Sequence, residues 1–495
     1  MENIFNEFSI NYNHFIFFFA SSLMLWYLVI ALISIREILL YQRKNSFIDL
    51  KKLLSSPYTP PISIVAPAYN EGSTIINSVH SLLSLQYPRF EVIIINDGST
   101  DNTLRKMIKG FSLVKVDYAY NEQIVTQPVR GFYKSINPAY SKLLIIDKEN
   151  GKSKADASNA GVNAAAYPYF VCTDVDCVID NQALLLMIKP FLDEEKRVIA
   201  NGAIIRIANG CEVEKGFLVN VKAPKNFLTS VQEIEYLRSY LLGRMAWSKI
   251  NGLIIVSGGI GLFDREIAIK AGGYDPKSFG EDMELTVRMR KCMHDIGQKY
   301  IVKYIPESLC WTEVPPTLDI FMKQRIRWAK GLVQTLFKHR SMWFNPKFGR
   351  MGLLSFPYWI LYEWLAPMIE LIGLISYSYL IYTGKINFEF SLLLLAFVFF
   401  FSVMITTISI LWEEYTNQVY KSKKEIFKLL LVIFLEPIFF HPIVVYASIK
   451  GNLSLLFGTK NAWGNMGRMG TDDDEPAKEI VPQIETPPQS ILKAS

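Results

Sequence analysis

The feature that most constrains this chain is a stretch near the N-terminus that carries no charge. It runs from Phe15 to Ile35 (FIFFFASSLMLWYLVIALISI) and is long enough, at about 1.5 Å per residue of helix, to cross the roughly 30 Å of a bilayer's hydrocarbon core. Acidic residues precede it and no small-residue cleavage site follows it, which favours a retained membrane span over a cleaved signal peptide. Basic residues follow the span directly, and the positive-inside rule then places the downstream chain in the cytoplasm. These residues are Arg36, Arg43, Lys44, Lys51 and Lys52.

Three more apolar runs lie near the C-terminal end of the sequence. They are Leu353–Tyr382, Ser391–Trp412 and Phe427–Ile449. A lysine-rich loop (residues 421–424) follows the second run, which is consistent with two crossings between the soluble region and that loop. A crossing by the third run would put the C-terminus outside, whereas Lys450, Lys460 and Arg468 favour the inside. The sequence therefore leaves the side of the C-terminus open.

Three glutamates interrupt these apolar runs. Glu363 and Glu370 lie in the first run and Glu436 in the third. A carboxylate in the membrane is costly unless it faces protein or a water-filled path. The glutamates indicate either a functional polar path or, in the long first run, a segment that lies at the membrane interface.

The composition excludes several classes of protein. The 495 residues are half hydrophobic and carry a formal charge of +6, which rules out a disordered or collagen-like chain. Six acids and two lysines give Thr471–Ser495 a charge of −4, so the rest carries +10 and favours anionic lipid or phosphorylated ligands. The acidic tail, with its four prolines, is predicted to be disordered. Five cysteines show no CxxC spacing, so we expect reduced thiols and no structural transition metal.

A soluble α/β domain with a mainly parallel sheet is predicted between the first span and the other runs. Short β-branched segments alternate there with helical ones, and polar residues cluster where the strands end, which is where open α/β sheets bind ligands. The insert at residues 111–141 is interpreted as a loop and a hairpin. The predicted strands are Ile62–Ala66, Glu91–Ile95, Leu143–Ile146, Tyr169–Thr173, Ile254–Phe263 and Tyr300–Ile305.

Acidic residues follow two of these strands. Asp97 ends the second, in Asn-Asp-Gly-Ser-Thr-Asp, where it would accept hydrogen bonds from a ribose or a base; an ordinary loop with a helix cap is the alternative. Asp174 and Asp176 follow the fourth strand with the spacing of a Mg²⁺ or Mn²⁺ site beside a diphosphate. Just upstream, Lys154 and Asp156 lie in a polar turn suited to phosphate or ribose.

Two further motifs precede the basic stretch. Ser257-Gly258 opens a small-residue segment that would let a bulky acceptor lie against the backbone, or that is simply a bulged strand. Glu281-Asp282 opens a predicted helix. Asp282 would be a general base for an acceptor hydroxyl, or a charge that complements the helix dipole.

A basic, aromatic-rich stretch, residues 321–350, adjoins the first C-terminal run. It carries eight Lys and Arg residues and no acid, which is typical of an interfacial helix; a nucleic-acid-binding face is the alternative, and the adjoining span disfavours it. Within it lies Gln324-Arg-Ile-Arg-Trp328, where an arginine fork would bind phosphate and the tryptophan face would stack on a sugar.

In this order, Asp97, Asp174/Asp176, Glu281-Asp282 and Gln324/Arg327/Trp328 resemble the D, DxD, ED, QxxRW series of the membrane-embedded, processive family 2 glycosyltransferases, which include cellulose, chitin, hyaluronan and poly-N-acetylglucosamine synthases. The resemblance implies a GT-A fold and inverting transfer from a nucleotide sugar. It also implies this division of the chain: residues 1–50, membrane helix and basic linker; 51–320, GT-A domain; 321–350, interfacial helix; 351–450, three membrane segments; 451–495, C-terminal segment with the acidic tail.

The resemblance also implies roles for individual residues. Tyr69, Glu71 and Asp97 would hold uracil and ribose, Asp174 the nucleotide and Asp176 the Mg²⁺ or Mn²⁺. Lys154 and Asp156 would contact the donor, and Asp282, with Glu281 beside it, would activate the acceptor hydroxyl. Ser257 and Gly258 would lie near the acceptor, and Gln324, Arg327 and Trp328 would close over the diphosphate and the acceptor end.

The function expected from this resemblance is extension and export of a β-linked polysaccharide from a UDP-sugar, UDP-N-acetylglucosamine or UDP-glucose. We expect a plasma or inner membrane location, a cytosolic catalytic domain and no nucleic-acid partner; accessory export subunits are compatible with it. One alternative is transfer of a single sugar to a lipid acceptor. Another is a transporter or scaffold that only binds nucleotide, although the runs show no repeated halves.

Overall fold

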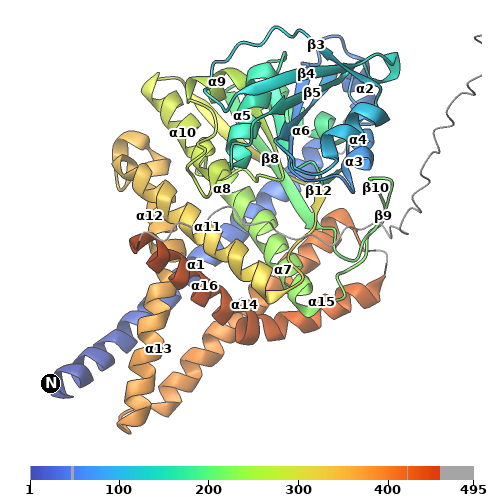
Figure 1. Cartoon of the computed structure of the whole chain (residues 1–495). Coiled ribbons are helices and arrows are strands. Elements are labelled where there is room, and N and C mark those ends of the chain that lie inside the picture. Colours follow the sequence, from blue (N-terminus) through green and yellow to red (C-terminus); the bar gives the residue numbers. More distant parts are fainter. Residues whose placement is uncertain (1, 46–48, 421, 458–495) are drawn as a thin grey trace, which may run out of the picture.

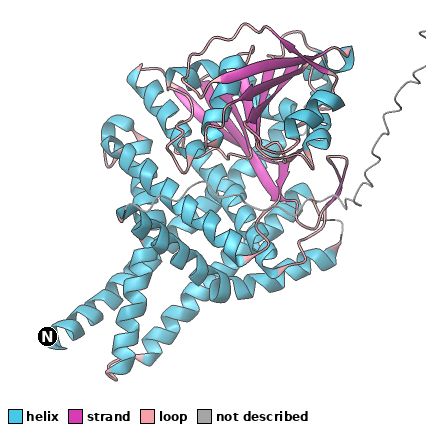
Figure 2. Ribbon diagram, in the orientation of Figure 1, coloured by secondary structure: helices cyan, strands magenta, loops and turns pink. Residues whose placement is uncertain are grey.

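A ten-stranded mixed sheet forms the centre of the domain in the computed structural model, which describes residues 2–45, 49–420 and 422–457 (Figures 1 and 2). Its strand order is β3-β4-β5-β2-β1-β6-β11-β8-β12-β7. The strands are β1 (Ile62–Ala68), β2 (Phe90–Asp97), β3 (Leu113–Val116), β4 (Val129–Ser135), β5 (Leu143–Lys148), β6 (Tyr169–Thr173), β7 (Val178–Ile179), β8 (Arg197–Ile207), β11 (Ile260–Asp264) and β12 (Tyr300–Thr312); β9 (Glu212–Glu214) and β10 (Phe217–Asn220) form a separate hairpin.

The sheet is less parallel than the sequence suggests. Strands β5, β2, β1 and β6 are parallel, as are β8 and β12, but β11 runs antiparallel between β6 and β8. Strands β3, β4 and β7 also pair antiparallel, so the expectation of a mainly parallel sheet is wrong. The pair β3 and β4 is the hairpin expected in the 111–141 insert.

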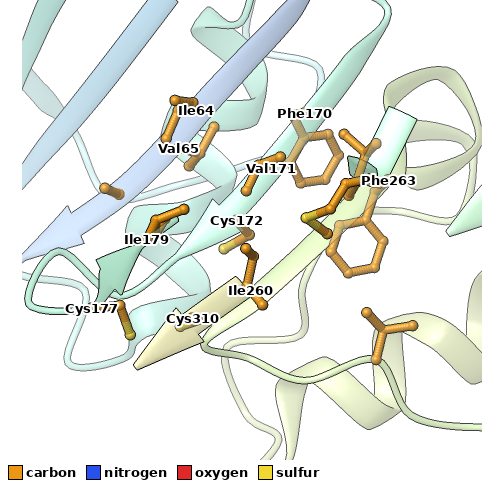
Figure 3. Packing of buried hydrophobic residues seen from close by; sticks show 14 of the residues in the cluster. Ile64, Val65, Phe170, Val171, Cys172, Cys177, Ile179, Ile260, Phe263 and Cys310 are labelled. Carbon is orange, nitrogen blue, oxygen red and sulfur yellow. The ribbon is translucent and has the colours of Figure 1, made fainter. Parts of the chain in front are cut away.

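Two strand predictions also change. The predicted strand Ile254–Phe263 is a strand only from Ile260, because its Ser-Gly-Gly part forms a loop instead of pairing. Strand β8 was not predicted, although it is buried almost throughout, and it carries the position of Arg206. Figure 3 shows the core between the central strands, with Ile64 and Val65 of β1 near Phe170 of β6 and Phe263 of β11.

Helices cover both faces of the sheet (Figure 2). They are α3 (Ile75–Leu83), α4 (Thr103–Gly110), α5 (Lys154–Ala164), α6 (Ala183–Asp193), α9 (Arg265–Lys270) and α10 (Glu281–Asp295), and α2 (Leu50–Ser55) precedes β1. Helix α5 lies very close to the sheet, because a β-carbon on Gly161 would lie only 2.5 Å from a methyl of Val65. This approach brings the N-terminus of α5, with Lys154, to the carboxyl ends of β1 and β2.

A helical layer lies below the sheet domain (Figure 1). It consists of α1 (Glu2–Asn45), α7 (Phe227–Leu237), a π-helical segment (Arg238–Arg244), α8 (Met245–Lys249), α11 (Leu318–Lys338), α12 (Phe356–Tyr358), a second π-helical segment (Trp359–Trp364), α13 (Ala366–Tyr382), α14 (Phe388–Asn417), α15 (Lys423–Leu435), a third π-helical segment (Glu436–Phe440) and α16 (His441–Leu456).

Four stretches of the described residues are long and apolar enough to cross a membrane. They are His14–Asn45, Met351–Tyr382, Phe388–Asn417 and Lys423–Leu456, and they contain the four apolar runs of the sequence. Large apolar side chains on the outside of α14, such as Leu393 (71% exposed), find a favourable environment only in lipid. The chain is therefore a membrane protein. The predicted disordered tail, residues 471–495, lies outside the described residues.

Candidate functional site

A cavity of about 1540 Å³ opens at the carboxyl ends of the central strands and continues among the helices below. Eleven of the predicted site residues share its lining with Gly258, although they are spread over more than 250 positions of the chain. They are Tyr69, Glu71, Asp97, Lys154, Asp174, Ser257, Glu281, Asp282, Gln324, Arg327 and Trp328. Asp156 and Asp176 are not among the lining residues.

Asp97, at the end of β2, is held by a buried lysine that the sequence analysis missed. Lys148 ends β5 and is fully buried, and its Nζ lies 2.9 Å from Oδ1 of Asp97 and 2.5 Å from Oδ2 of Asp156. The amide of Gly151 also donates to Asp97, at 3.0 Å. Burial raises the pKa of Asp97, while Lys148 and the Gly151 amide oppose that rise.

Asp156 is the second carboxylate that binds Lys148. Its carboxylate accepts hydrogen bonds from Lys148 and from the amide of Gln127, and it is 5% exposed. Asp156 thus shares Lys148 with Asp97 and does not line the cavity, where we expected it to meet the donor. The charged pair Asp147-Lys148 at the end of the otherwise apolar segment Leu143–Lys148 was the sequence signal for the missing partner.

Lys154, at the start of α5, connects two parts of the site. Its Nζ lies 2.6 Å from Oδ1 of Asp174 and donates to the carbonyl of Gly258 at 2.9 Å. Burial alone would lower the pKa of Lys154, but the carboxylates of Asp174 and Glu281 outweigh it and raise the pKa. The lysine therefore stays cationic and ties the turn after β6 to the Ser257-Gly258 loop.

The turn after β6 could hold a divalent cation. Asp174 and Asp176 are both half-buried there, and the described residues contain no group of three or more metal-ligating side chains. Mg²⁺ is commonly held by one or two carboxylates, with water and substrate phosphates as the remaining ligands. The donor set thus fits a cation that binds together with a diphosphate.

Asp282, in the first turn of α10, lies across from Gly258. A β-carbon on Gly258 would be 3.4 Å from Oδ2 of Asp282 and 3.7 Å from Nζ of Lys154. The amide of Met283 donates to Oδ1 at 2.8 Å, which leaves Oδ2 directed toward the loop. Burial and the neighbouring Asp282 raise the pKa of Glu281, against the attraction of Arg327 and Lys154.

Helix α11 brings the third group of residues to the cavity. Gln324, Arg327 and Trp328 all line it, and the amide oxygen of Gln324 is buried without a hydrogen-bond partner among the described residues. Arg325 is used differently: both of its terminal nitrogens bind the carboxylate of Glu235 on α7, at 2.7 and 2.6 Å, and its guanidinium lies 4.3 Å from the ring of Trp328.

The cavity continues among the candidate membrane helices. Each of the four apolar stretches contributes to the lining: Tyr27 from α1, Glu363 from the second π-helical segment, Ile405 from α14 and Ser448 from α16. Aromatic rings line the connection, namely Tyr236, Tyr240, Trp247, Tyr358 and Trp359. One continuous cavity thus joins the strand ends to the interior of the helical layer.

A buried ion network joins the sheet to α14. Arg206 of β8 is 1% exposed and contacts Glu233 of α7 at 2.6 Å and Glu413 of α14 at 2.8 Å. The hydroxyl of Tyr420 also donates to Glu233, at 2.8 Å. This network holds the membrane helix in a defined position relative to the sheet domain, and the sequence analysis did not find it.

Two family models match most of the region that builds this site. Residues 63–214 match glycosyl transferase family 2, and residues 191–412 match glycosyl transferase family group 2. The chain belongs to glycosyltransferase family 2. Membership favours an enzyme over the transporter or scaffold.

Curated relatives of this glycosyltransferase agree with that assignment. A poly-β-1,6-N-acetyl-D-glucosamine synthase from Staphylococcus epidermidis is 29% identical over 69% of this chain and 70% of its own length. The synthase of the same name from Staphylococcus aureus (strain COL) is 27% identical over 61% of this chain and 60% of its own length.

The fold of this glycosyltransferase is also found in a solved structure. The mannosyltransferase PcManGT from Pyrobaculum calidifontis, solved in complex with GDP-mannose and Mn²⁺, covers 88% of this chain and 100% of its own, with a TM-score of 0.52 and 18% identity. At that identity the likeness shows the fold alone, and the expected GT-A domain is confirmed.

Proposed function

We propose that this protein is a processive synthase that extends a β-linked polysaccharide from a UDP-sugar and passes the product through its own membrane helices. The carrying observation is the continuous cavity that connects the carboxylate of Asp282 with residues of all four apolar stretches. UDP-N-acetylglucosamine is the favoured donor, because the two staphylococcal relatives are named as synthases of an N-acetylglucosamine polymer.

In this proposal the donor nucleotide lies against the ends of β1 and β2. Tyr69 and Glu71, with Asp97, contact the uridine, and the Lys148 ammonium keeps the Asp97 carboxylate in place. Lys154 of α5 and Arg327 of α11 both line the cavity and would reach the diphosphate, while the unpartnered amide oxygen of Gln324 would accept a hydrogen bond from a sugar hydroxyl. The two cationic side chains would stabilise the negative charge that develops on UDP as it leaves.

A divalent cation, Mg²⁺ or Mn²⁺, would be held by Asp176 and Asp174 and would neutralise charge on the diphosphate when bound. Lys154 at the start of α5 pairs with Asp174 at 2.6 Å, so the phosphate-binding lysine would lie beside the turn that holds the cation. The mannosyltransferase PcManGT, which shares this fold, was solved with Mn²⁺, and this favours a divalent ion here.

Asp282 acts as the general base in this mechanism. Its Oδ2 faces the Gly258 backbone, where an acceptor hydroxyl can approach because no side chain intervenes. Removal of the hydroxyl proton by Asp282 lets the oxygen attack the anomeric carbon opposite the leaving UDP, so that the configuration inverts. Trp328, supported by Arg325, provides a ring surface for the acceptor sugar.

The catalytic domain faces the cytoplasm in this proposal, in a plasma or inner membrane, because the basic residues after the first span are retained on that side. The polymer then leaves the cytoplasm through the aromatic-lined part of the cavity. Transfer of one sugar to a lipid acceptor is the second candidate, since the same opening into the membrane would admit a lipid-linked acceptor.

Donor turnover by the purified protein in lipid nanodiscs tests the proposal. A panel of UDP-sugars and GDP-mannose is offered with Mg²⁺ or Mn²⁺, and nucleotide release is followed by product sizing. One UDP-sugar giving a long polymer supports the synthase; a single-sugar glycolipid supports the lipid acceptor. Release from GDP-mannose alone would reject the UDP-sugar proposal.

The role of Asp282 is tested by Asp282→Asn. The expected result is loss of turnover with UDP binding retained, because the amide cannot accept the proton. Asp295→Asn is the matched control, since Asp295 lies on the exposed end of the same helix. Unchanged turnover in Asp282→Asn would reject this role.

A further inference from the structure

The last apolar stretch, Lys423–Leu456, is long enough to cross a membrane only if it is counted as one helix. It is built as two. Helix α15 has 13 residues and α16 has 16, and a π-helical segment that starts at Glu436-Pro437 separates them. At about 1.5 Å per residue these helices are about 20 and 24 Å long, and each is shorter than a hydrocarbon core of roughly 30 Å.

Both ends of this stretch are held by elements that adjoin the catalytic domain. Near its start, Glu425 accepts a hydrogen bond from the amide of Ala223 at 2.6 Å, just before α7. Near its end, Gly451 lies against α11, where a β-carbon would be 2.8 Å from that of Ala329 and 3.0 Å from the carbonyl of Ile326. Helix α11 also carries the cavity residues around Arg327, so the chain has returned to the level of the site at Gly451.

Helices α15 and α16 meet at an angle (Figure 1), and this bend lies close to the catalytic side of the helical layer. His441 pairs with Glu370 at 2.8 Å, and Glu370 is in the second turn of α13 counted from its catalytic end. Arg238 joins Glu436, at 3.2 Å, to the hydroxyl of Thr406, at 2.8 Å.

The position of Thr406 along α14 gives the depth of the bend in the membrane. Helix α14 extends from Thr406 back to Phe388 by about 27 Å at 1.5 Å per residue, nearly the thickness of a hydrocarbon core. The bend therefore lies at one edge of the apolar layer. Figure 1 agrees, because the turn between α13 and α14 and the N-terminal part of α1 extend well beyond α15 and α16.

The outer face of α15 is suited to lipid. Phe427, Leu431 and Phe434, with Ile438 of the π-helical segment that follows, are 47–62% exposed and recur at helical spacing, whereas Leu429 and its neighbours on the inner face are buried. Lys423 and Lys424 are exposed at the start of the helix. Lysines at the end of an apolar helix can reach the headgroups while the apolar side chains contact acyl chains.

We infer that Lys423–Leu456 is a re-entrant hairpin in the leaflet on the side of the catalytic domain, and that its partner is the lipid of that leaflet. Of the four apolar stretches among the described residues, the three that contain α1, α13 and α14 then cross the membrane. The end of α16 lies on the same side as the catalytic domain, which removes the conflict between charge and parity: Lys450 is retained on the side where basic residues are expected.

Cysteine accessibility in sealed cells and inside-out vesicles tests this topology. Single cysteines are placed in a background in which the partly exposed Cys211 and Cys292 are serine. Phe439→Cys probes the bend and Leu456→Cys the end of α16; they are 57% and 80% exposed. Lys299→Cys marks the catalytic side and Lys385→Cys the turn between α13 and α14, both at exposed positions. Donor turnover confirms that each variant is folded.

With a membrane-impermeant maleimide, we expect Lys385→Cys to be labelled from the side opposite to Lys299→Cys. Phe439→Cys should not be labelled from the Lys385 side, and Leu456→Cys should be labelled only from the Lys299 side. Labelling of Phe439→Cys together with Lys385→Cys would show that the bend crosses the membrane, and labelling of Leu456→Cys with Lys385→Cys would show a single crossing. Either result overturns the inference, and Ile438→Cys repeats the bend measurement if Phe439→Cys is inactive.

Discussion

Gly331 on α11 lies with its backbone against Gly280, the residue that precedes α10. A β-carbon on Gly331 would be 2.7 Å from the Gly280 nitrogen and 2.8 Å from its Cα, closer than any side chain allows. The two glycines thus let the helix that carries Arg327 approach the helix that carries Asp282. The distance between Arg327, which would contact the leaving diphosphate, and Asp282, which would activate the acceptor, depends on this contact.

Gly331→Ala is therefore expected to lower turnover by up to about 100-fold, because a misplacement on the order of 1 Å has that effect on reacting groups. The measurement is donor turnover at saturating UDP-sugar. Lys323→Ala is the control on the same helix, since it removes only an exposed ion pair with Asp319 and should leave turnover nearly unchanged. Full activity in Gly331→Ala would show that the helices can separate without consequence.

Lys148→Met is expected to destabilise the protein by about 3–5 kcal/mol, because it leaves the buried carboxylates of Asp97 and Asp156 without their cation. Adding Asp156→Asn should recover part of that loss by removing one of the two charges. Thermal unfolding with and without UDP measures both effects, and Lys134→Met, at an exposed position, is the control. Equal stability of Lys148→Met and the unaltered protein would contradict the assigned role.

The two arginines of the Gln324–Trp328 motif should respond differently to lysine. Arg325→Lys loses the two-point pairing with Glu235 and the stacking under Trp328, so the expected result is a lower unfolding temperature. Arg327→Lys should have the same unfolding temperature as the unaltered protein. Its kcat should fall about 100-fold or more, the usual effect of removing one group that stabilises developing charge. The reverse pattern would exchange the two roles.

Chelation should stop turnover without unfolding the protein. The proposed cation is held by two carboxylates and the substrate, so no part of the fold depends on it. EDTA is expected to abolish nucleotide release, Mn²⁺ or Mg²⁺ to restore it, and Asp176→Asn to raise the concentration of Mn²⁺ needed. Turnover that continues in excess EDTA would reject the cation.

Stability should depend on pH through Glu284, which is 0% exposed between α10 and α11. Burial would raise its pKa, but His339, Arg288 and Lys338 prevail and hold the pKa at about 2, below the ordinary value of 4.5. A lowered carboxyl pKa stabilises the fold above pH 4.5, and that contribution is lost as the pH falls from 4.5 toward 2.

Thermal unfolding between pH 7 and 3 measures this dependence. Glu284→Gln should be less stable at pH 7 and show a flatter decline. Glu266→Gln is a strict control: the pKa of Glu266 is also about 2, yet the side chain is 54% exposed, where salt and water weaken the ion pair. An equal loss of thermal stability between pH 7 and 3 in both variants would contradict the larger contribution assigned to the buried carboxylate of Glu284.

The residue types of the site could be predicted from the sequence, because each lies at a point where a regular pattern ends. Asp97 and Asp174 follow apolar strands, Asp282 opens a helix, and Arg327 lies in a basic helix beside a span. Each position has a local cause. The membrane stretches were predicted for a similar reason, since hydrophobic length is a local property.

Other features depend on pairs of residues far apart in the chain. Lys148 beside Asp97, Arg325 on Glu235 and Arg206 between two glutamates could not be predicted, because a buried charge reveals its partner only after the chain has folded. The direction of β11 was also undetermined, since an apolar strand has the same pattern in parallel and antiparallel pairing.

The sequence by itself determined that this chain has an α/β catalytic domain, apolar helices for a membrane, and an ordered set of acidic and basic motifs, because composition and periodicity act over a few residues. Only the tertiary structure decided that Asp156 and Asp97 share the ammonium group of Lys148. It alone decided that Gly280 and Gly331 bring α10 and α11 together. It also decided that a π-helical segment at Glu436–Phe440 interrupts the last apolar stretch and that Gly451 lies against α11. Hydropathy measures how readily a segment enters lipid, whereas its direction there is set by contacts with the rest of the fold.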